Sequence, residues 1–316
     1  MAKTPVPDLA LNSVSDEVIR LDPNGERIAA VLRKTIDQLY DGQRTGRYKW
    51  EQLHKTERTH CGTLVEINLH REFNFSDGAE LDYEIAGFEV DCKYSQKLGG
   101  WMIPPEALGK LCLLLWASDE LSKWNIGIVR ANPHFLGAPN RDGKAALNDK
   151  GRLAIHWLYL PHQNGKNARL AQLQQLDLQP NILLRLPKIS VDGIMQLRHG
   201  TKRLNQLFRV AIEQRVARGV VATVARQDDY MKRIRDNGGS RGALRPEGIV
   251  ILGQFKSHAA IAKALGVPIP GPGESVSVRV SPSVKNVPGS VLIAKKYWRK
   301  ATIGDPVVSA PKLPSS

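Results

Sequence analysis

Polar and apolar residues alternate on both sides of Ala86-Gly87, and this pattern constrains the fold more than any other stretch of the chain. Ala86-Gly87 has suitable chemistry for the tight turn of a β-hairpin. Pairing outward from that turn places Asp82 opposite Asp91 and Glu84 opposite Glu89. Opposite residues share a sheet face, so the second face is apolar and consists of Tyr83, Ile85, Phe88, Val90 and Cys92. We therefore expect a hairpin with one core face and one charged face.

The charged face of this hairpin predicts a metal site. Like charges directly opposite each other on a sheet are unfavourable, so two facing carboxylate pairs require a cation. Mg²⁺ is the natural candidate, because its usual site combines hard oxygen ligands with substrate phosphates. Lys93 lies two residues after Asp91 and projects from the same face, where it could hold a phosphate oxygen or lower the pKa of an attacking water. Glu66, further upstream, could complete the acidic cluster. The alternative is an exposed hairpin whose charges are merely solvated.

The net charge of +14 is unevenly distributed along the chain. Residues 1–160 contain 20 Lys and Arg against 22 Asp and Glu, whereas residues 161–316 contain 25 against 9. A half-chain that basic attracts polyanions, of which nucleic acid is the most common. The alternative is a basic surface that only keeps the protein in solution. A membrane is a less suitable partner, because no basic amphipathic helix stands out in the sequence. We expect two domains with separate functions.

Cysteine usage and hydropathy indicate a cytoplasmic protein. The N-terminus lacks the apolar core of a signal peptide, and the longest apolar runs are far too short to span a bilayer. The three cysteines, Cys61, Cys92 and Cys112, are odd in number and widely spaced. That pattern suits a reducing cytosol rather than a disulfide framework or a zinc site.

Periodicity and composition outline the domains. Helical spacing covers 16–41 with a break at Asp22–Gly25, and strand character marks 63–69, 80–93, 111–116 and 126–129. A Gln- and Asn-rich stretch separates this part from a helix-rich region at 200–236 and a strand at 248–252. The Pro- and Ser-rich end is expected to be a loose tail. We place a catalytic domain at 1–162, a linker at 163–175 and a basic DNA-binding domain at 176–316.

A helix-turn-helix is predicted within the basic half. Helix Val220–Ala225 leads through a short turn into a second, basic helix over 230–235, and the glycines of 238–242 offer backbone donors to phosphates. The alternative is a solvated basic helix. A similar pattern at 261–268 is rejected because the prolines that follow forbid a recognition helix. The expected DNA contacts are Arg226, Gln227, Lys232, Arg233, Arg235, Ser240 and Arg241.

Two further stretches of the first half resemble functional motifs. The polar loop ending at Arg141 contains Gly137, Asn140 and Arg141, and Asn and Arg suit base-edge contacts to adenine and guanine. Leu39-Tyr40-Asp41-Gly42 is one residue away from the KxDG motif of DNA ligases. Leucine has no amine to form the adenylated intermediate, so ligase chemistry is excluded and we expect a helix that ends at Gly42.

The order Glu66, Asp82, Asp91-Cys92-Lys93 resembles that of the PD-(D/E)xK nucleases, with Leu81 in place of the proline. Longer runs are similar to the family of NaeI-like type IIE restriction endonucleases. These runs include 39–43, 52–57, 59–72, 82–87, 135–137 with 140–142, 227–229 and 245–249. The resemblance extends over nearly the whole chain and weakens around 145–200 and after 253.

This resemblance implies an α/β fold with a mixed central sheet flanked by helices, followed by a helix-rich DNA-binding domain with a helix-turn-helix or winged-helix-like motif. It assigns metal binding to Glu66, Asp82 and Asp91 and the catalytic lysine role to Lys93. It further implies a bacterial homodimer that hydrolyses both strands of duplex DNA with Mg²⁺, leaving 5′-phosphates at a palindrome such as GCCGGC. A second copy of the palindrome, held by the C-terminal domain, would be the activator. The alternatives are a DNA-binding regulator without cleavage activity and a nicking or repair nuclease with the same core.

Overall fold

The computed structural model describes residues 7–159 and 173–314, and the chain divides into two compact units. The first unit contains Met1–Leu39 and Leu53–Gln179, and the second contains Tyr40–Gln52 and Pro180–Ser316. Of the expected linker, only residues 173–175 lie within the described ranges. Across those ranges, no helix is long and apolar enough to cross a membrane.

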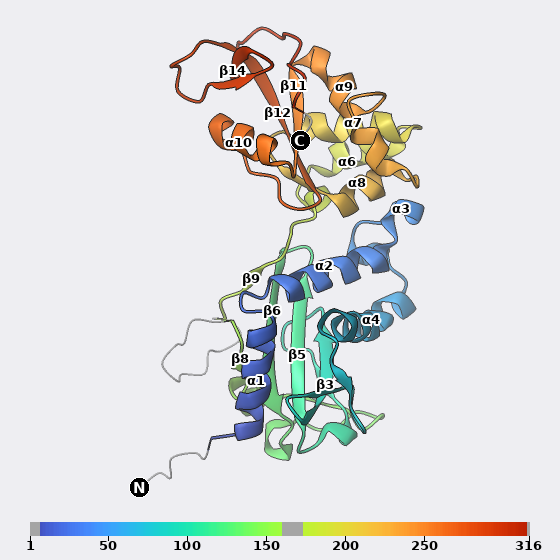
Figure 1. The fold of residues 1–316 in the computed structure, drawn as a ribbon. Helices are drawn as coiled ribbons and strands as arrows, with labels where there is room; N and C mark the ends of the chain where they lie inside the picture. The colour runs from blue at the N-terminus through green and yellow to red at the C-terminus, as the bar shows by residue number, and fades with distance from the viewer. Residues whose placement is uncertain (1–6, 160–172, 315–316) are drawn as a thin grey trace. The chain divides into compact units, whose positions relative to one another are not determined.

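A mixed seven-stranded sheet forms the centre of the first unit (Figure 1). Its path runs β1-β2-β3-β5-β6-β8, with β9 also paired to β6, and only the β3–β5 pair is parallel. The strands are β1 (Ser76–Asp77), β2 (Tyr83–Ile85), β3 (Phe88–Ser95), β5 (Leu111–Ser118), β6 (Lys123–Arg130), β8 (His156–Trp157) and β9 (Leu176–Asp177). As the continuous apolar run predicted, β5 is central and buried along nearly its whole length. A separate pair consists of β4 (Met102–Ile103) and β7 (Ala145–Ala146).

Helices flank this sheet, which confirms the predicted mixed α/β architecture. They are α1 (Leu9–Leu21), α2 (Glu26–Tyr40), α4 (Lys55–Phe73) and α5 (Asp149–Leu153), with short 3-10 helices η2 (Pro105–Ala107) and η3 (Pro133–Phe135). Helix α1 packs against β6 and α4 against β3. The break between α1 and α2 falls at Asp22–Gly25 as expected, although α1 begins earlier than predicted.

The strand expected at 63–69 is wrong, because this stretch lies inside helix α4. The Glu57 carboxylate accepts a hydrogen bond from the His54 backbone N–H at 2.8 Å, which closes the first turn of the helix. The helix buries one residue per turn, namely Cys61, Val65, Leu69 and Phe73. Glu66 is therefore a helical residue, one position after the buried Val65.

The hairpin register is confirmed. Tyr83 pairs with Val90, Glu84 with Glu89 and Ile85 with Phe88 across the antiparallel β2–β3 ladder. Ala86 and Gly87 both have positive φ (53° and 79°), as a tight two-residue hairpin turn requires. Most of the predicted apolar face is buried, but Phe88 beside the turn remains 38% exposed.

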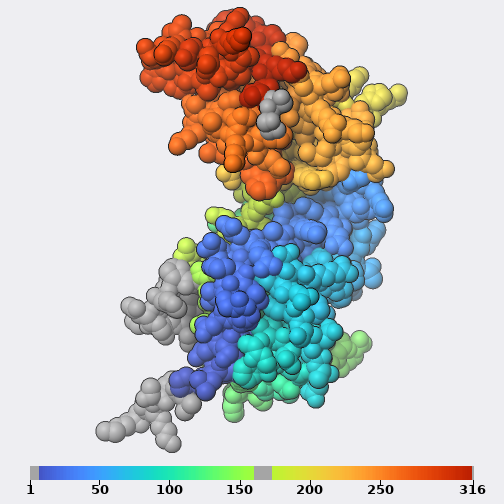
Figure 2. Space-filling view, in the orientation of Figure 1, coloured from blue at the N-terminus to red at the C-terminus, as the bar shows by residue number. Residues whose placement is uncertain are grey.

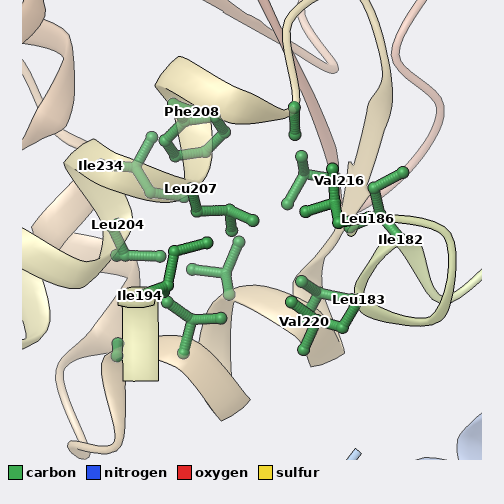
Figure 3. Packing of buried hydrophobic residues seen from close by; sticks show 14 of the residues in the cluster. Ile182, Leu183, Leu186, Ile194, Leu204, Leu207, Phe208, Val216, Val220 and Ile234 are labelled. Atoms are coloured by element: carbon green, nitrogen blue, oxygen red, sulfur yellow. The ribbon is translucent and has the colours of Figure 1, made fainter. Parts of the chain in front are cut away.

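Helices and short 3-10 segments form the first part of the second unit. They are α3 (Gly42–Thr45), η1 (Trp50–Gln52), η5 (Ile182–Leu184), α6 (Lys188–Gln196), α7 (Gly200–Val210), α8 (Arg218–Ala225), η6 (Tyr230–Ile234), α9 (Ser240–Leu244) and η7 (Arg245–Glu247). Figure 3 shows side chains from η5, α6, α7, α8 and η6 meeting in one buried cluster, with Phe208 and Leu204 fully enclosed. Burial of such apolar surface is the main stabilising contribution to this unit.

The segment Tyr40–Gln52 belongs to the second unit although its chain neighbours on both sides belong to the first. The expected helix end at Gly42 is wrong, since α2 ends at Tyr40 and Asp41 takes the left-handed conformation with φ 47°. Gly42 instead begins α3, which packs on α8. The carboxamide of Gln43 donates to Asp228 at 2.9 Å, and Asn181 donates to the Tyr48 carbonyl at 2.8 Å.

A five-stranded antiparallel sheet completes the second unit, with β12 paired to β10, β11 and β14. Its elements are β10 (Arg215–Ala217), β11 (Ile249–Gly253), β12 (Glu274–Ser283), β13 (Val291–Ile293) and β14 (Lys296–Lys300), and α10 (Lys256–Leu265) lies between β11 and β12 in sequence. Helix α10 shares a second buried cluster with these strands. Figure 2 shows the orange and red parts of the chain, which include β11 to β14, as one continuous surface.

The C-terminal segment is not the loose tail that its composition predicted. Residues 303–314 have no helix or strand, yet Ala310 is 2% exposed. Its N–H donates to the Arg245 carbonyl at 2.8 Å, and its carbonyl accepts from Arg245 Nε at 3.2 Å. Two reciprocal hydrogen bonds therefore fasten this segment to η7.

Candidate active site

Asp91 and Lys93 form the centre of the candidate site on strand β3. Asp91 is only 3% exposed, and its Oδ1 accepts a hydrogen bond from Lys93 Nζ at 2.6 Å. Burial raises the pKa of Asp91, and the neighbouring Lys93 opposes that shift. Burial alone would lower the pKa of Lys93, but the hydrogen bond and charge of Asp91 outweigh it, so this pKa is raised. Lys93 therefore stays protonated at neutral pH.

Asp82 precedes β2 and points toward the same ammonium group. Its Oδ2 lies 3.7 Å from Lys93 Nζ and accepts a hydrogen bond from the Cys92 backbone N–H at 2.7 Å. The hairpin thus places Asp82 beside Asp91, as the register predicted, and Lys93 lies within ion-pair distance of both carboxylates.

Glu66 approaches this group from helix α4. Burial raises the pKa of Glu66, and the negative charges of Asp82 and Asp91 raise it further. The Tyr83 hydroxyl donates to the backbone carbonyl of Glu66 at 2.7 Å and so ties the helix to the hairpin. Two carboxylates from the hairpin and one from the helix therefore interact electrostatically.

The second carboxylate pair of the hairpin is not part of this group. Glu89 Oε2 lies 3.2 Å from Lys110 Nζ, and Glu89 Oε1 accepts from the Glu80 backbone N–H at 2.8 Å. These contacts hold the pKa of Glu89 below its ordinary value. Glu84, opposite Glu89, is exposed to solvent. Lys110, rather than a metal ion, therefore balances Glu89.

The donor chemistry of the site suits a hard divalent cation, but its side chains are arranged around Lys93. Among the described residues, no three His, Cys, Asp or Glu side chains are grouped closely enough to hold a metal ion. Three carboxylates face one ammonium, so the group has an excess of negative charge. The pKa of Glu66 is raised first by burial and then by the charges of Asp82 and Asp91. Carboxylate oxygens and a negative excess are what Mg²⁺ binds.

One contact within the site and one beside it have no clear signal in the sequence. Cys112 is the register partner of Asp91 on the parallel strand β5, and its thiol lies 3.9 Å from Asp91 Oδ2. Lys110 lies just before the same strand. Both contacts depend on the pairing of β3 with β5, and nothing local in the sequence specifies that pairing.

The loop expected to read bases in the first unit is exposed and internally ordered. Asn140 Oδ1 accepts hydrogen bonds from the backbone N–H groups of Asp142 (2.9 Å) and Lys144 (3.0 Å). Its oxygen therefore shapes the loop, while the Arg141 side chain is 95% exposed. Gly137 donates its N–H to the Ala146 carbonyl at 2.9 Å and anchors the loop base.

The predicted DNA-contact residues of the second unit differ in their accessibility. Arg226, Lys232 and Arg235 are exposed. Arg233 is paired with Asp229, to which Gln227 also donates. Ser240 is fully buried, so its hydroxyl is withdrawn from the surface on which we expected it.

The second helix of the predicted helix-turn-helix is also interrupted. Tyr230–Ile234 forms one short 3-10 helix, and α9 follows only after Gly238 and Gly239. Gly238 has φ 72°, a conformation that ends a helix.

A mixed sheet flanked by helices, with two acidic side chains and a lysine on one hairpin, defines a nuclease of the restriction-endonuclease type. The chain matches the family model for restriction endonuclease NaeI over residues 12–309. It is also 48% identical over 315 residues to the type II restriction enzyme NaeI of Lentzea aerocolonigenes, an alignment that covers 98% of this chain and 95% of that relative. The chain belongs to the NaeI restriction endonuclease family and is a type II restriction endonuclease, a site-specific deoxyribonuclease.

Proposed function

We propose that Asp82, Asp91 and Glu66 hold Mg²⁺ and that Lys93 supports hydrolysis of both strands of duplex DNA. The observation that carries this proposal is the Lys93 ammonium lying 2.6 Å from Asp91 and 3.7 Å from Asp82. Glu66 interacts electrostatically with all three groups. Bound Mg²⁺ supplies a Lewis acid that stabilises charge on phosphate and lowers the pKa of water. Water oxygen bonds to phosphorus as the water loses a proton to solvent, and the bond from phosphorus to the 3′ oxygen breaks. The 3′ oxygen takes up a proton from solvent, so a 5′-phosphate and a 3′-hydroxyl remain.

In this proposal the chain's own residues orient the reacting groups. Lys93 keeps its proton and donates N–H to a phosphate oxygen, which stabilises the charge that develops there. The Cys92 backbone N–H fixes the Asp82 carboxylate, and the hydroxyl of Tyr83 fixes the helix turn that carries Glu66. Burial of Asp91 restricts its carboxylate to one orientation.

Asp91→Ala and Glu89→Gln test this assignment as a matched pair. Both variants remove a carboxylate from the same strand, but only Asp91 contacts Lys93. With supercoiled plasmid and Mg²⁺, Asp91→Ala should lose cleavage while still binding DNA, and Glu89→Gln should cut at nearly the wild-type rate. An Asp91→Ala enzyme that cuts as fast as wild type rules out the assignment.

We further infer that the second unit binds DNA through a winged-helix-like arrangement. Its chain order is α7, β10, α8, the segment 230–247, β11 and β12, and β12 pairs with both β10 and β11. In such domains the helix after the turn enters the major groove. Here that helix is replaced by the interrupted segment that carries Lys232, Arg235 and Arg241. The net charge of residues 161–316 supports binding to a polyanion.

The target, activation and assembly of the enzyme follow as proposals from its family. We propose a homodimer that cuts a G/C-rich palindrome, GCCGGC, after a second copy of the palindrome binds the C-terminal unit. Plasmid cleavage with mapped ends tests the sequence and distinguishes double-strand cutting from nicking. Cleavage of a one-site substrate, with and without an added uncleavable duplex, tests activation. Three free buried cysteines suit the bacterial cytosol as the place of action.

A further inference from the structure

A hollow of about 270 Å³ opens within the second unit. Its walls come from the start of α8, from η6 and α9, and from the adjoining ends of β11 and β12. Three arginines line it, together with apolar and uncharged polar groups, and a single carboxylate. The arginines are Arg218, Arg235 and Arg241.

None of these three guanidinium groups lies within ion-pair distance of a carboxylate among the described residues. Other arginines of this unit do, as the pairs Arg209–Glu247 and Arg299–Asp305 show. Asp236 attracts Arg241 only at longer range and is itself paired with Lys312 at 3.6 Å. The one carboxylate in the wall, that of Glu274, is already engaged. Its Oε2 accepts the Gly271 N–H at 2.9 Å and lies 3.6 Å from Nε of Arg215, which is not one of the three arginines of the hollow. The hollow therefore gathers three guanidinium charges, and the protein balances them only in part.

Two of the arginines are held in place by a single N–H each. Arg218 Nε donates to the Tyr230 hydroxyl at 2.9 Å, and its guanidinium lies 5.7 Å from the centre of that ring. Arg241 Nε donates to the Ile251 carbonyl at 2.9 Å. When Nε holds a guanidinium in place, its terminal N–H groups can donate to phosphate oxygens. Two such hydrogen bonds to one phosphate are the usual arrangement.

The wall of the hollow near Arg241 is formed closely by the backbone of Gly253. A Cβ at Gly253 would lie 2.8 Å from a terminal nitrogen of Arg241. Burial lowers the pKa of Arg241, since its charge is partly withdrawn from water. An anion in the hollow would offset this cost of desolvation.

We propose that this hollow binds a phosphodiester group of the DNA held by the second unit, with Arg218, Arg235 and Arg241 around the phosphate. The inference rests on the proposed function, in which this unit binds a duplex. The hollow is larger than a phosphate, and Met231 and Phe255 provide apolar surface for the attached sugar. Arg218 stands at the start of α8, the helix that precedes the turn, and in helix-turn-helix motifs that helix crosses the DNA backbone.

The test compares the double variant Arg218→Gln/Arg235→Gln with Lys285→Gln. Both arginines are exposed, so their replacement should preserve the fold, and Lys285 is an exposed cation in the loop after β12, outside the hollow. DNA binding is measured by fluorescence anisotropy in EDTA over a range of salt concentrations. The double variant should bind about tenfold more weakly to any duplex sequence, because phosphates carry no sequence information. The slope of log K against log salt should fall by about 1.

An unchanged affinity and salt slope in the double variant, equal to those of Lys285→Gln, overturns the inference. A second arm uses inorganic phosphate and a mononucleotide as probes of thermal stability. Stabilisation by either probe that the double variant loses, with DNA binding unaffected, assigns the hollow to free phosphate compounds and likewise overturns the DNA-backbone inference. DNA binding is measured in EDTA, whereas cleavage is measured with Mg²⁺ on the wild-type enzyme. A negative result for the hollow can therefore be distinguished from a failure of the proposed cleavage function.

Discussion

Lys93 Nζ donates a hydrogen bond to Asp91 Oδ1 at 2.6 Å, although the two residues are only two positions apart on one strand. Alternate residues of a strand project from the same face, so this contact needs no long-range folding to bring the groups together. The parallel strand β5 then buries Asp91 and keeps it beside Lys93. The centre of the site is thus built locally and enclosed by the sheet.

Lys93→Met should reduce single-turnover cleavage by about 10² to 10³ while leaving DNA binding in EDTA nearly unchanged. The reason is loss of a fixed donor to the developing phosphate charge. Lys110→Met is the matched control. Lys110 is also a lysine paired with a carboxylate of this hairpin, but its partner is Glu89. Equal cleavage losses in the two variants would mean that general charge, not the position of Lys93, matters.

Cleavage should decline on acidification at a pH above the ordinary titration range of carboxyl groups. Burial raises the pKa of Asp91, and burial together with the charge of Asp82 raises that of Glu66. In the proposed site both groups must be ionised to bind metal, so protons and Mg²⁺ should compete. A series of pH–rate profiles at increasing Mg²⁺ should therefore show the acid limb moving to lower pH. A limb that stays at one pH at every Mg²⁺ concentration contradicts the assignment.

Asp91→Asn should stabilise the metal-free protein at neutral pH even though it abolishes cleavage. A raised pKa means that the folded state binds this proton more tightly than the unfolded state. Stability is then lost as pH rises from the ordinary value of 3.8 through the folded value. Thermal unfolding in EDTA at pH 7 should show a gain of roughly 2–4 °C. The gain should shrink toward pH 4, and a variant that is less stable than wild type at pH 7 refutes this argument.

The hairpin was predictable because strand alternation and turn chemistry are local. Helix α4 was not, since Thr63, Val65 and Ile67 give its middle the composition of a strand. The burial of Val65 and Leu69 one turn apart decides in favour of the helix, and that burial depends on packing against β3. Propensity is a weak guide where tertiary contacts select the structure.

The hollow of the second unit could not have been predicted. Arg218 was not among the expected DNA contacts, and its neighbour Arg241 is 23 positions further along the chain. Their convergence depends on how α8 and α9 meet the end of β11. Charge counting predicted a basic unit, but only the fold shows which cations lack a carboxylate partner.

Gly42→Ala should destabilise the protein by about 1–3 kcal/mol, because overpacking a filled contact forces the backbone to shift. A Cβ at this position would overlap with Thr223 Oγ1 and lie 2.8 Å from the Arg47 carbonyl. The added change Thr223→Ala should recover part of the loss. Gly62→Ala is the control, since a Cβ there meets nothing within 4 Å and should stabilise α4 by up to about 1 kcal/mol. Urea unfolding measures all four proteins, and equal effects of the two alanines would contradict the packing explanation.

The second unit should lose stability as pH falls below about 6.5, and His258 should account for much of this loss. His258 is 1% exposed, and its Nδ1 accepts the Gly253 N–H at 2.9 Å. The proton therefore sits on Nε2, which lies 3.1 Å from the Pro314 carbonyl. Burial, followed by the charge of Arg241, lowers the pKa of His258 below 6.5. Between the folded and unfolded values, only the unfolded chain binds the proton, so acid favours unfolding.

Calorimetric unfolding of wild type, His258→Gln and His199→Gln between pH 7.5 and pH 5 tests this prediction. His258→Gln should be less stable at pH 7.5, because it disturbs two buried hydrogen bonds. Its stability should then change less with pH, since the titrating group is gone. His199 is an exposed histidine of the same unit, and its replacement should leave the wild-type pH dependence unchanged. If wild type and His258→Gln lose stability in parallel on acidification, another group is responsible. The neutral imidazole of His258, with its two hydrogen bonds, then does not limit the acid stability of this unit.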